Sequence, residues 1–321
     1  MRRTLDGTDR RIAAALLASP RAGWRELSHC LGLSERTVVR RAAPLYADGT
    51  LRATVVRNPA HFPGLVPMAL RIRCRPARIR HLAAALAHRP DTVWVDVLGG
   101  GDEISAVFFL DGPDARTALL LRDLPATEAV DSWTAHTLLR VFPTAFRWTA
   151  GLLTPEETAR LAPDPPTAPA PPTLQHGVDA ALITALSEDG RATYTDLARR
   201  ADTTALTARR RLDALLRGHV LRLATELDLA LLGAHAEALL WLTVHPGALE
   251  RTARALSTHP QVRFAAATTG PANLLVALAA TDLDALYTFL VTTVGPLPGI
   301  TAIETTPLLA TAKRTGLTRR P

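Results

Sequence analysis

The chain has 321 residues, a formal charge of +7, an isoelectric point near 10.5 and a mean hydropathy of +0.09. That length exceeds what one hydrophobic core usually supports, so two or more domains are expected. The basic balance favours a polyanionic partner such as nucleic acid, or an acidic membrane surface. All but one of the 37 basic residues are arginine, which together with abundant Ala and Pro points to a GC-rich coding bias. The positions of the arginines are therefore more informative than their number.

Several classes of protein are not supported by the sequence. Cys30 and Cys74 lie among apolar residues outside any metal or redox spacing, so we predict two buried small side chains. The N-terminus lacks the apolar run of a signal peptide. The most apolar segment, 273–295, is interrupted by Asp282 and Asp284 and fails as a membrane span. We expect a cytoplasmic protein that holds no metal or cofactor and is not an enzyme.

The two halves of the chain match without a gap when one is shifted by 170 residues. The repeated unit has roughly 150 residues, a typical size for a domain pair. Arg21 then falls on Arg191 and Gly100 on Gly270, and the apolar rhythm agrees between them. We interpret this as a tandem duplication. Residues 151–173 lie between the copies, and six prolines fall between 163 and 172. Because proline removes backbone donors, this linker is predicted to be a stiff, extended spacer without a helix.

The first part of each copy has the spacing of a helix-turn-helix. In copy one, residues 9–18 and 24–31 predict two helices, and a third begins after Gly32 with Ser34 as N-cap. The third helix is predicted to bury a stripe at i, i+4 and i+7, made by Val38, Ala42 and Leu45, and in copy two by Ala208, Leu212 and Leu215 after Thr204. Pro44 falls inside this helix, and a short strand follows it, near 51–56 and 221–225.

The second part of each copy predicts the order β-α-β-β-α-β, the split βαβ plan of a ferredoxin-like sheet. The expected elements are 68–74, 78–89, 92–99, 104–110, 115–124 and 130–139 in copy one, and 238–244, 248–257, 262–268, 273–279, 283–293 and 300–309 in copy two. The fold class is therefore α+β, with two tandem units of helix-turn-helix plus ferredoxin-like domain. The expected boundaries are 1–58, 59–150, 151–173 for the linker, 174–228 and 229–321.

The third helix of each copy is the candidate for reading DNA. In a helix-turn-helix this helix enters the major groove, where arginine binds guanine or phosphate. The alternative is an amphipathic helix with a solvated arginine face. Both copies keep the cap, the turn, the threonine and the arginine cluster, which favours DNA binding. The expected DNA-binding residues are Ser34, Glu35, Arg36, Thr37, Val39, Arg40 and Arg41 in copy one, and Thr204, Thr207, Arg209, Arg210 and Arg211 in copy two.

The motif Leu5-Asp6-x-x-Asp9, followed by Leu33-Ser34-x-x-Thr37-Val38-x-x-Arg41, resembles the Lrp/AsnC (feast/famine) transcriptional regulators. The βαββαβ part resembles the effector-binding and oligomerisation domain of that family. The resemblance implies a regulator that binds double-stranded DNA and a small-molecule effector, an amino acid or related metabolite. It also implies an intrachain pseudo-dimer that assembles into a further homo-oligomer. In copy two, Thr203 and His219 replace Leu33 and Gly49 of copy one.

The effector loop of the family is usually Gly-x-Tyr-Asp, and both copies depart from that pattern. The loops run from Gly100 to Glu103 and from Gly270 to Asn273, so an acidic residue closes the first and an amide the second. The effector-binding residues that the resemblance implies are Gly100, Asp102, Glu103, Thr269, Gly270 and Asn273.

Two other functions share this architecture. Sirohaem-type decarboxylases resemble it as well, and they rely on His and Arg near a tetrapyrrole. The ten histidines here are scattered, none recurs at matched positions of the repeat, and no catalytic triad spacing is present. An effector sensor that does not bind DNA is the third possibility. The paired arginine clusters favour the DNA-binding regulator.

Overall fold

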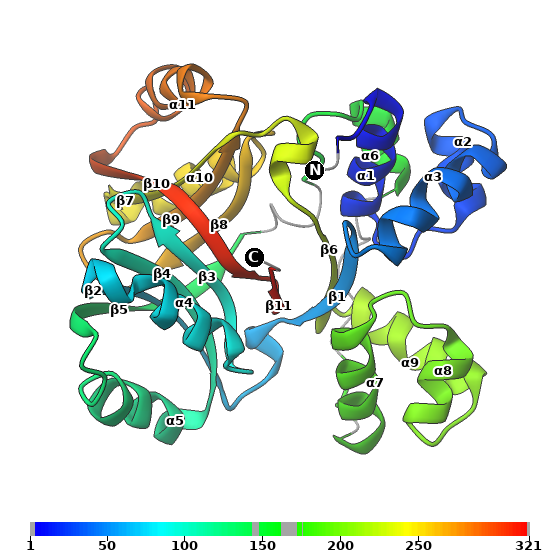
Figure 1. The fold of residues 1–321 in the computed structure, drawn as a ribbon, viewed down its shortest axis with the longest axis horizontal. Coiled ribbons are helices and arrows are strands. Elements are labelled where there is room, and N and C mark those ends of the chain that lie inside the picture. The colour runs from blue at the N-terminus through cyan, green and yellow to red at the C-terminus, as the bar shows by residue number, and fades with distance from the viewer. Residues whose placement is uncertain (1–3, 143–147, 162–171, 175, 320–321) are drawn as a thin grey trace. The chain divides into compact units, whose positions relative to one another are not determined.

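A computed structural model describes residues 4–142, 148–161, 172–174 and 176–319. The chain divides into two compact units, and each unit takes one segment from each copy of the repeat. The helical unit comprises Met1–Phe62 and Phe146–Leu232, and the sheet unit comprises Pro63–Ala145 and Gly233–Pro321. In Figure 1 the first unit contains α1–α3 and α6–α9 with the strands β1 and β6, and the second contains the other strands with α4, α5, α10 and α11. No described helix is long and apolar enough to cross a membrane.

The helical unit contains the two predicted helix-turn-helix copies. Its elements are α1 (Gly7–Ala18), α2 (Trp24–Leu31), α3 (Glu35–Ala47) and β1 (Arg52–Arg57) in copy one, and α7 (His176–Glu188), α8 (Tyr194–Arg200), α9 (Ala205–Arg217) and β6 (Leu221–Glu226) in copy two. The six side chains of the predicted stripes on α3 and α9 are fully buried. Pro44 lies on the exposed side of α3, and the helix continues through it to Ala47.

Strands β1 and β6 join the two copies within the helical unit. They pair antiparallel from Arg52 opposite Glu226 to Arg57 opposite Leu221, between the two groups of helices (Figure 1). The backbone N–H of Gly190, just after α7, donates to the carbonyl of Ala53 at 2.9 Å. A Cβ atom on Gly190 would lie 2.5 Å from a backbone atom of β1, so this close approach requires glycine.

A reciprocal arginine contact also links the copies. Arg21 Nη1 donates to the carbonyls of Gly190 and Ala192 at 2.8 and 2.9 Å. Its counterpart Arg191 donates to the carbonyls of Pro20 and Ala22 at 2.7 and 3.2 Å. The contact is therefore self-complementary, as in the interface of a two-fold symmetric dimer.

One prediction about the linker is wrong. Residues Pro155–Leu161 form α6, inside the segment 151–173 that was expected to hold no helix. Thr154 accepts the Glu157 N–H at 3.2 Å, and the Glu157 carboxylate accepts the Thr154 N–H at 2.9 Å. This is a capping box followed by proline at the first helical position, where the missing N–H costs nothing. The proline-rich residues 162–171 lie outside the described part of the chain.

The sheet unit contains both predicted βαββαβ domains. Copy one supplies β2 (Leu65–Cys74), α4 (Ile79–His88), β3 (Thr92–Leu98), β4 (Glu103–Asp111), α5 (Gly112–Ala118) and β5 (Val130–Val141). Copy two supplies β7 (Ala236–Val244), α10 (Pro246–Ser257), β8 (Val262–Thr268), β9 (Leu274–Ala280), α11 (Leu283–Phe289), β10 (Ile300–Arg314) and β11 (Leu317–Thr318). Helices α5 and α11 each continue into a π-helical turn, Leu119–Asp123 and Leu290–Val294, and a 3-10 turn forms at Pro76–Arg78. Two further 3-10 turns, Pro59–His61 and Leu229–Leu232, lie at the ends of the two segments of the helical unit.

The two four-stranded sheets close on each other. Within each copy the strand order is that of a ferredoxin-like sheet, β3-β4-β2-β5 and β8-β9-β7-β10. The last strand of each copy then pairs with the second strand of the other, β5 with β8 and β10 with β3. The result is a barrel-like ring in which neither copy is complete alone. This confirms the prediction of an intrachain pseudo-dimer.

The closure creates a third apolar core. One face of each sheet packs under its own helices, around residues such as Ile72 in copy one and Leu240 in copy two. The other faces meet inside the ring, where Leu98, Val107, Leu239, Trp241 and Phe264 are all buried. Both faces of these strands are therefore covered.

Candidate functional site

The N-terminus of each reading helix is fixed by a hydroxyl cap. In α3, Ser34 Oγ accepts the Thr37 N–H at 3.1 Å and lies 2.8 Å from the Thr37 hydroxyl. In α9, Thr204 Oγ1 accepts the Thr207 N–H at 3.1 Å and lies 2.9 Å from the Thr207 hydroxyl. These four residues were expected to contact DNA, and here they shape the helix start, which is where a helix favours phosphate.

The outward positions of the two helices differ. Glu35, Arg36, Val39 and Arg40 are exposed on α3, and their counterparts Ala205, Leu206, Arg209 and Arg210 are exposed on α9. The exposed fraction of Leu206 is 59%, so α9 presents a large apolar side chain to solvent beside its arginines. The exposed face of α9 is thus less polar at its start and more basic one turn later than that of α3.

Two of the expected DNA-binding arginines are held by carboxylates of the first helix of their own copy. Arg211 forms a bidentate pair with Asp179 at 2.6 and 2.7 Å, and the two side chains are only 12% and 3% exposed. In copy one, Arg41 binds Asp9 at 3.0 Å and also Asp6. The hydrogen bonds that Asp6 accepts from the Asp9 N–H and from Arg41 lower the pKa of Asp6. Arg41 and Arg211 thus brace the helix-turn-helix.

Arg40 and Arg210 are different. Both are exposed, and neither forms an ion pair within the described ranges of the chain. Arg209 makes a long contact of 3.9 Å with Asp213 and lies over the ring of Tyr194 at 5.8 Å. Arg40 and Arg210 are therefore the matched pair of cations whose charge faces solvent on the two helices.

The expected effector loops lie in the sheet unit, where the two copies of the repeat meet. Gly99, in the loop between β3 and β4, donates its N–H to the carbonyl of Pro307 of β10 at 2.8 Å. Thr269, in the loop between β8 and β9, donates its N–H to the carbonyl of Thr137 of β5 at 3.0 Å. An added Cβ on Gly270, which has φ of +103°, would lie 2.6 Å from Nδ1 of His136. Each loop is thus fastened to the last strand of the other copy.

Several polar groups of these loops already have partners. Asn273 exchanges hydrogen bonds with the backbone of Val244 at 2.8 and 2.9 Å. The Asp102 carbonyl accepts the Cys74 N–H at 2.8 Å. Glu103 binds Arg71 of β2 at 2.6 and 2.9 Å, and Arg71 also binds Glu304 of β10 at 2.7 Å through two nitrogens. The last residue of the first loop, Glu103, therefore shares Arg71 with Glu304 of the second copy.

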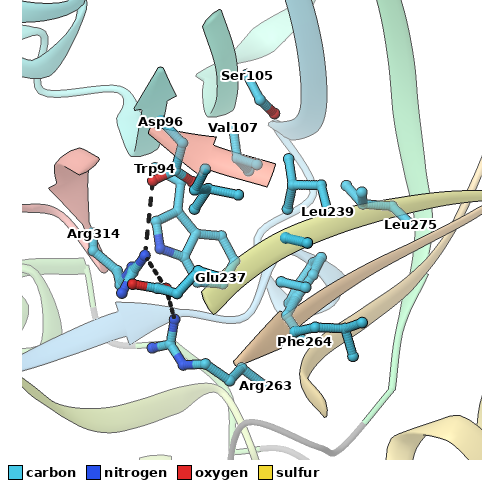
Figure 2. A pocket seen from close by; sticks show the side chains of 14 residues that line it. Trp94, Asp96, Ser105, Val107, Glu237, Leu239, Arg263, Phe264, Leu275 and Arg314 are labelled. Carbon is cyan, nitrogen blue, oxygen red and sulfur yellow. Dashed lines mark hydrogen bonds and ion pairs between the residues drawn. The ribbon is translucent and has the colours of Figure 1, made fainter. Parts of the chain in front are cut away.

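A second charged group lies inside the ring (Figure 2). Arg314 Nη2 binds Glu237 at 2.7 Å and lies 3.8 Å from Asp96, and Arg263 lies 3.7 Å from Glu237. Burial raises the pKa of Asp96, opposed by the charge of Arg314 and a hydrogen bond from Thr311. The group borders a cavity of about 20 Å³ beside Trp94 and Phe264, room for about one water molecule. Three of the four equivalent positions in the other copy are apolar, namely Ala266 for Asp96, Val93 for Arg263 and Pro67 for Glu237.

The charged groups around Arg71 and Arg314 were not predicted from the sequence. Residues alternate along β2, so Leu70 and Ile72 face the helices and Arg71 faces the other side. In a single-layer sheet that side faces water. The signal that pointed to a second buried face was the apolar content of both faces, with Val107 and Phe109 alternating with Phe108 and Leu110 along β4. Within the described residues, no group of His, Cys, Asp and Glu has the geometry of a metal site.

Two domain models of one protein family match this chain. The model of the AsnC-type helix-turn-helix domain matches residues 5–45 and 177–216, and the model of the Lrp/AsnC ligand binding domain matches residues 237–318. Uncharacterized HTH-type transcriptional regulators of Pyrococcus abyssi and Pyrococcus horikoshii are 27% and 26% identical over 143 residues. Each alignment covers 44% of this chain and 90% of the relative, which is the ratio expected for a duplicated unit.

Some solved structures match over nearly the full length. The siroheme decarboxylase NirDL aligns with a TM-score of 0.60 at 12% identity, covering 97% of this chain and 93% of that protein. At this identity the match shows a shared fold, in which two helix-turn-helix copies and two ferredoxin-like domains follow one another in a single chain.

Proposed function

The chain belongs to the Lrp/AsnC family, and we propose that it is a sequence-specific DNA-binding transcriptional regulator whose activity responds to a small-molecule effector. The observation that carries the proposal is the matched pair of solvent-facing arginines, Arg40 on α3 and Arg210 on α9. Each follows a capped helix start, where the helix dipole and free N–H groups favour phosphate. Bound DNA is contacted by both reading helices of one chain, so one polypeptide supplies what other proteins supply as a dimer.

The test is the double variant Arg40→Ala with Arg210→Ala, measured on DNA selected from a random pool. We expect weaker binding and a flatter slope of log affinity against log salt, by about one for each phosphate that the variant no longer binds. The control is Arg75→Ala with Arg122→Ala, which removes the same charge from two arginines of the sheet unit that are 66% and 75% exposed. Equal affinity and slope in the wild type and the reading-helix variant would contradict the proposal.

The alternative function is tetrapyrrole decarboxylation, because the fold is shared over the full length with the siroheme decarboxylase NirDL. We propose regulation instead of an enzymatic activity. The solvent-facing arginines at matched positions of α3 and α9 support this choice. An absorbance scan after incubation with sirohaem separates the two functions, since an enzyme would bind the pigment and change its spectrum. A stoichiometric spectral change followed by release of a decarboxylated product would favour the enzyme.

A further inference from the structure

Arg71 is an enclosed cation with two partners of very different exposure. Its side chain is 16% exposed and lies inside the ring of strands. Glu103, at the start of β4, is 12% exposed and binds Nε and Nη2 of the guanidinium. Glu304, on β10, is 54% exposed and binds Nη1 and Nη2. One arginine thus receives one carboxylate from the interior and one from the surface.

The two carboxylates are not equally necessary. A cation that is largely removed from water needs a partner, and Glu103 alone neutralises Arg71 with bidentate geometry. Glu304 is then a surplus negative charge whose pairing is only half shielded from water, so its release costs little. The hydrogen bonds from Arg71 lower the pKa of Glu304, so the carboxylate is ionised at neutral pH. Glu304 therefore occupies two N–H groups of the guanidinium that another carboxylate would bind equally well.

A second observation at the same place is an unused hydrogen-bond donor. The ring of Trp241 lies 5.6 Å from the guanidinium carbon of Arg71, and the residue is 2% exposed. Its indole N–H has no hydrogen-bond acceptor among the described residues. A buried N–H without an acceptor costs about 1–3 kcal/mol. Because the guanidinium lies over this ring, an exchange of the carboxylate bound to Arg71 changes the surroundings of the indole.

The arrangement exists once in the chain. The positions equivalent to Arg71, Glu103 and Glu304 in the other copy are Trp241, Asn273 and Thr134, which cannot form an arginine–carboxylate cluster. Arg71 and Trp241 are themselves equivalent positions, and they lie against each other across the pseudo-symmetry of the ring. A symmetric dimer would present two identical half-sites here, whereas the duplicated chain presents one asymmetric site.

We propose that Arg71 is the binding site of a small carboxylate ligand, and that Glu304 occupies the ligand's place in this structure. The ligand carboxylate replaces Glu304 on Nη1 and Nη2, and Glu304 moves into water. Both oxygens of Glu103 remain bound to Arg71, so this carboxylate is not available to an ammonium group, and the site recognises the ligand by its carboxylate. The proposal rests on the proposed effector-dependent regulation, because the exchange breaks an ion pair that links β2 of copy one to β10 of copy two.

The experiment follows the indole N–H signals of the full-length protein by NMR during titration with succinate. The chain has five tryptophans, and the variant Trp241→Phe identifies the Trp241 signal by its loss. We expect this signal to shift saturably with succinate and not with the neutral analogue succinamide. In Glu304→Gln the competing charge is gone, so we expect succinate to bind about tenfold more tightly, the equivalent of one charge-assisted hydrogen bond. In the double variant Arg71→Gln with Glu103→Gln, which leaves no unpaired buried charge, the response should disappear.

Each outcome has one meaning. An equal response to succinamide, an unchanged affinity in Glu304→Gln, or a response that persists in the double variant overturns the site. DNA binding is measured in parallel without succinate, in the wild type and in the variant Arg40→Ala with Arg210→Ala. If DNA binding depends on Arg40 and Arg210 but Trp241 does not respond to succinate, the regulator stands and the site is wrong. If Trp241 responds but the chain does not bind DNA, the site stands and the regulator is wrong.

Discussion

The two helix-turn-helix copies have the same buried stripe and the same hydroxyl cap, but they differ at almost every position that faces solvent. Ala208, Leu212 and Leu215 of copy two are as completely buried as their counterparts in copy one. On the outward side, only Arg40 and Arg210 are alike among the four matched positions at the helix start. Packing has thus preserved the inner face of the motif, while the surface of each copy has changed on its own.

The copies also differ in how the reading helix is fastened. In copy two the Arg211–Asp179 pair is buried, with exposed fractions of 12% and 3%, whereas Arg41 of copy one is 27% exposed and shares two carboxylates. Removing one member of a buried pair leaves an uncompensated charge, which costs much more than the loss of an exposed pair. The two copies should therefore respond unequally to the same substitution.

The largest expected effect comes from Arg211→Ala, which leaves the Asp179 carboxylate buried without its main cation. We expect a loss of about 3 kcal/mol in the stability of copy two, measured by hydrogen exchange of the α9 amides. Arg41→Ala should cause a smaller loss in α3. Asp179→Ala combined with Arg211→Ala should recover part of the stability, and Arg210→Ala, which removes an exposed charge, should leave it unchanged. Equal losses in the two copies would show that the difference in burial has no energetic consequence.

The next effect concerns DNA sequence. Because α3 and α9 present different outward residues, we expect two unlike half-sites about one helical turn apart, or a multiple of that. Arg36 can bind guanine, whereas Leu206 can at most contact a thymine methyl group. A half-site placed under the wrong helix should cost about 1–3 kcal/mol for each mismatched base pair. Selection from a random pool resolves the two half-sites.

A variant in which α3 and α9 present the same outward residues tests whether these residues determine the DNA sequence that is bound. The variant Ala205→Glu, Leu206→Arg and Arg209→Val gives α9 the outward residues of α3 at positions that are all exposed. We expect it to select a site with equal, palindromic halves. Recovery of a palindrome from the wild type at single-chain spacing would mean that the outward residues do not determine the sequence that is bound.

The sequence predicted what depends on local pattern and on the repeat. Periodicity located the helices and strands, the Ser34 and Thr204 caps were identified by residue type, and the resemblance implied the pseudo-dimer that the closed ring confirms. The helix at 155–161 was not predicted, because the prolines that follow it were given more weight than the capping box formed by Thr154 and Glu157. The Arg71 cluster was not predictable from strand alternation alone. It forms because two sheets from distant parts of the chain close on each other. The apolar residues on both faces of β4 indicate a second covered face, but they do not indicate which side chains meet there.

The smallest expected effect tests the turns of copy two. Gly32 and Gly49 have φ of +66° and +76°, and their counterparts Asp202 and His219 keep positive φ of +46° and +54° without being glycine. The backbone of copy two thus retains a conformation that favours glycine after the glycines themselves have been lost. Asp and His tolerate this region better than most residues, so the cost is modest.

We expect Asp202→Gly and His219→Gly each to stabilise copy two by about 0.5–1 kcal/mol, and Gly32→Ala and Gly49→Ala to destabilise copy one by a similar amount. No heavy atom lies within 4 Å of the Cβ position at Gly32 or Gly49, so the effect in copy one isolates backbone conformation from packing. Thermal denaturation combined with hydrogen exchange of α3 and α9 measures the change in each copy. A loss of stability in Asp202→Gly would show that the aspartate side chain contributes more to the turn than its backbone strain removes.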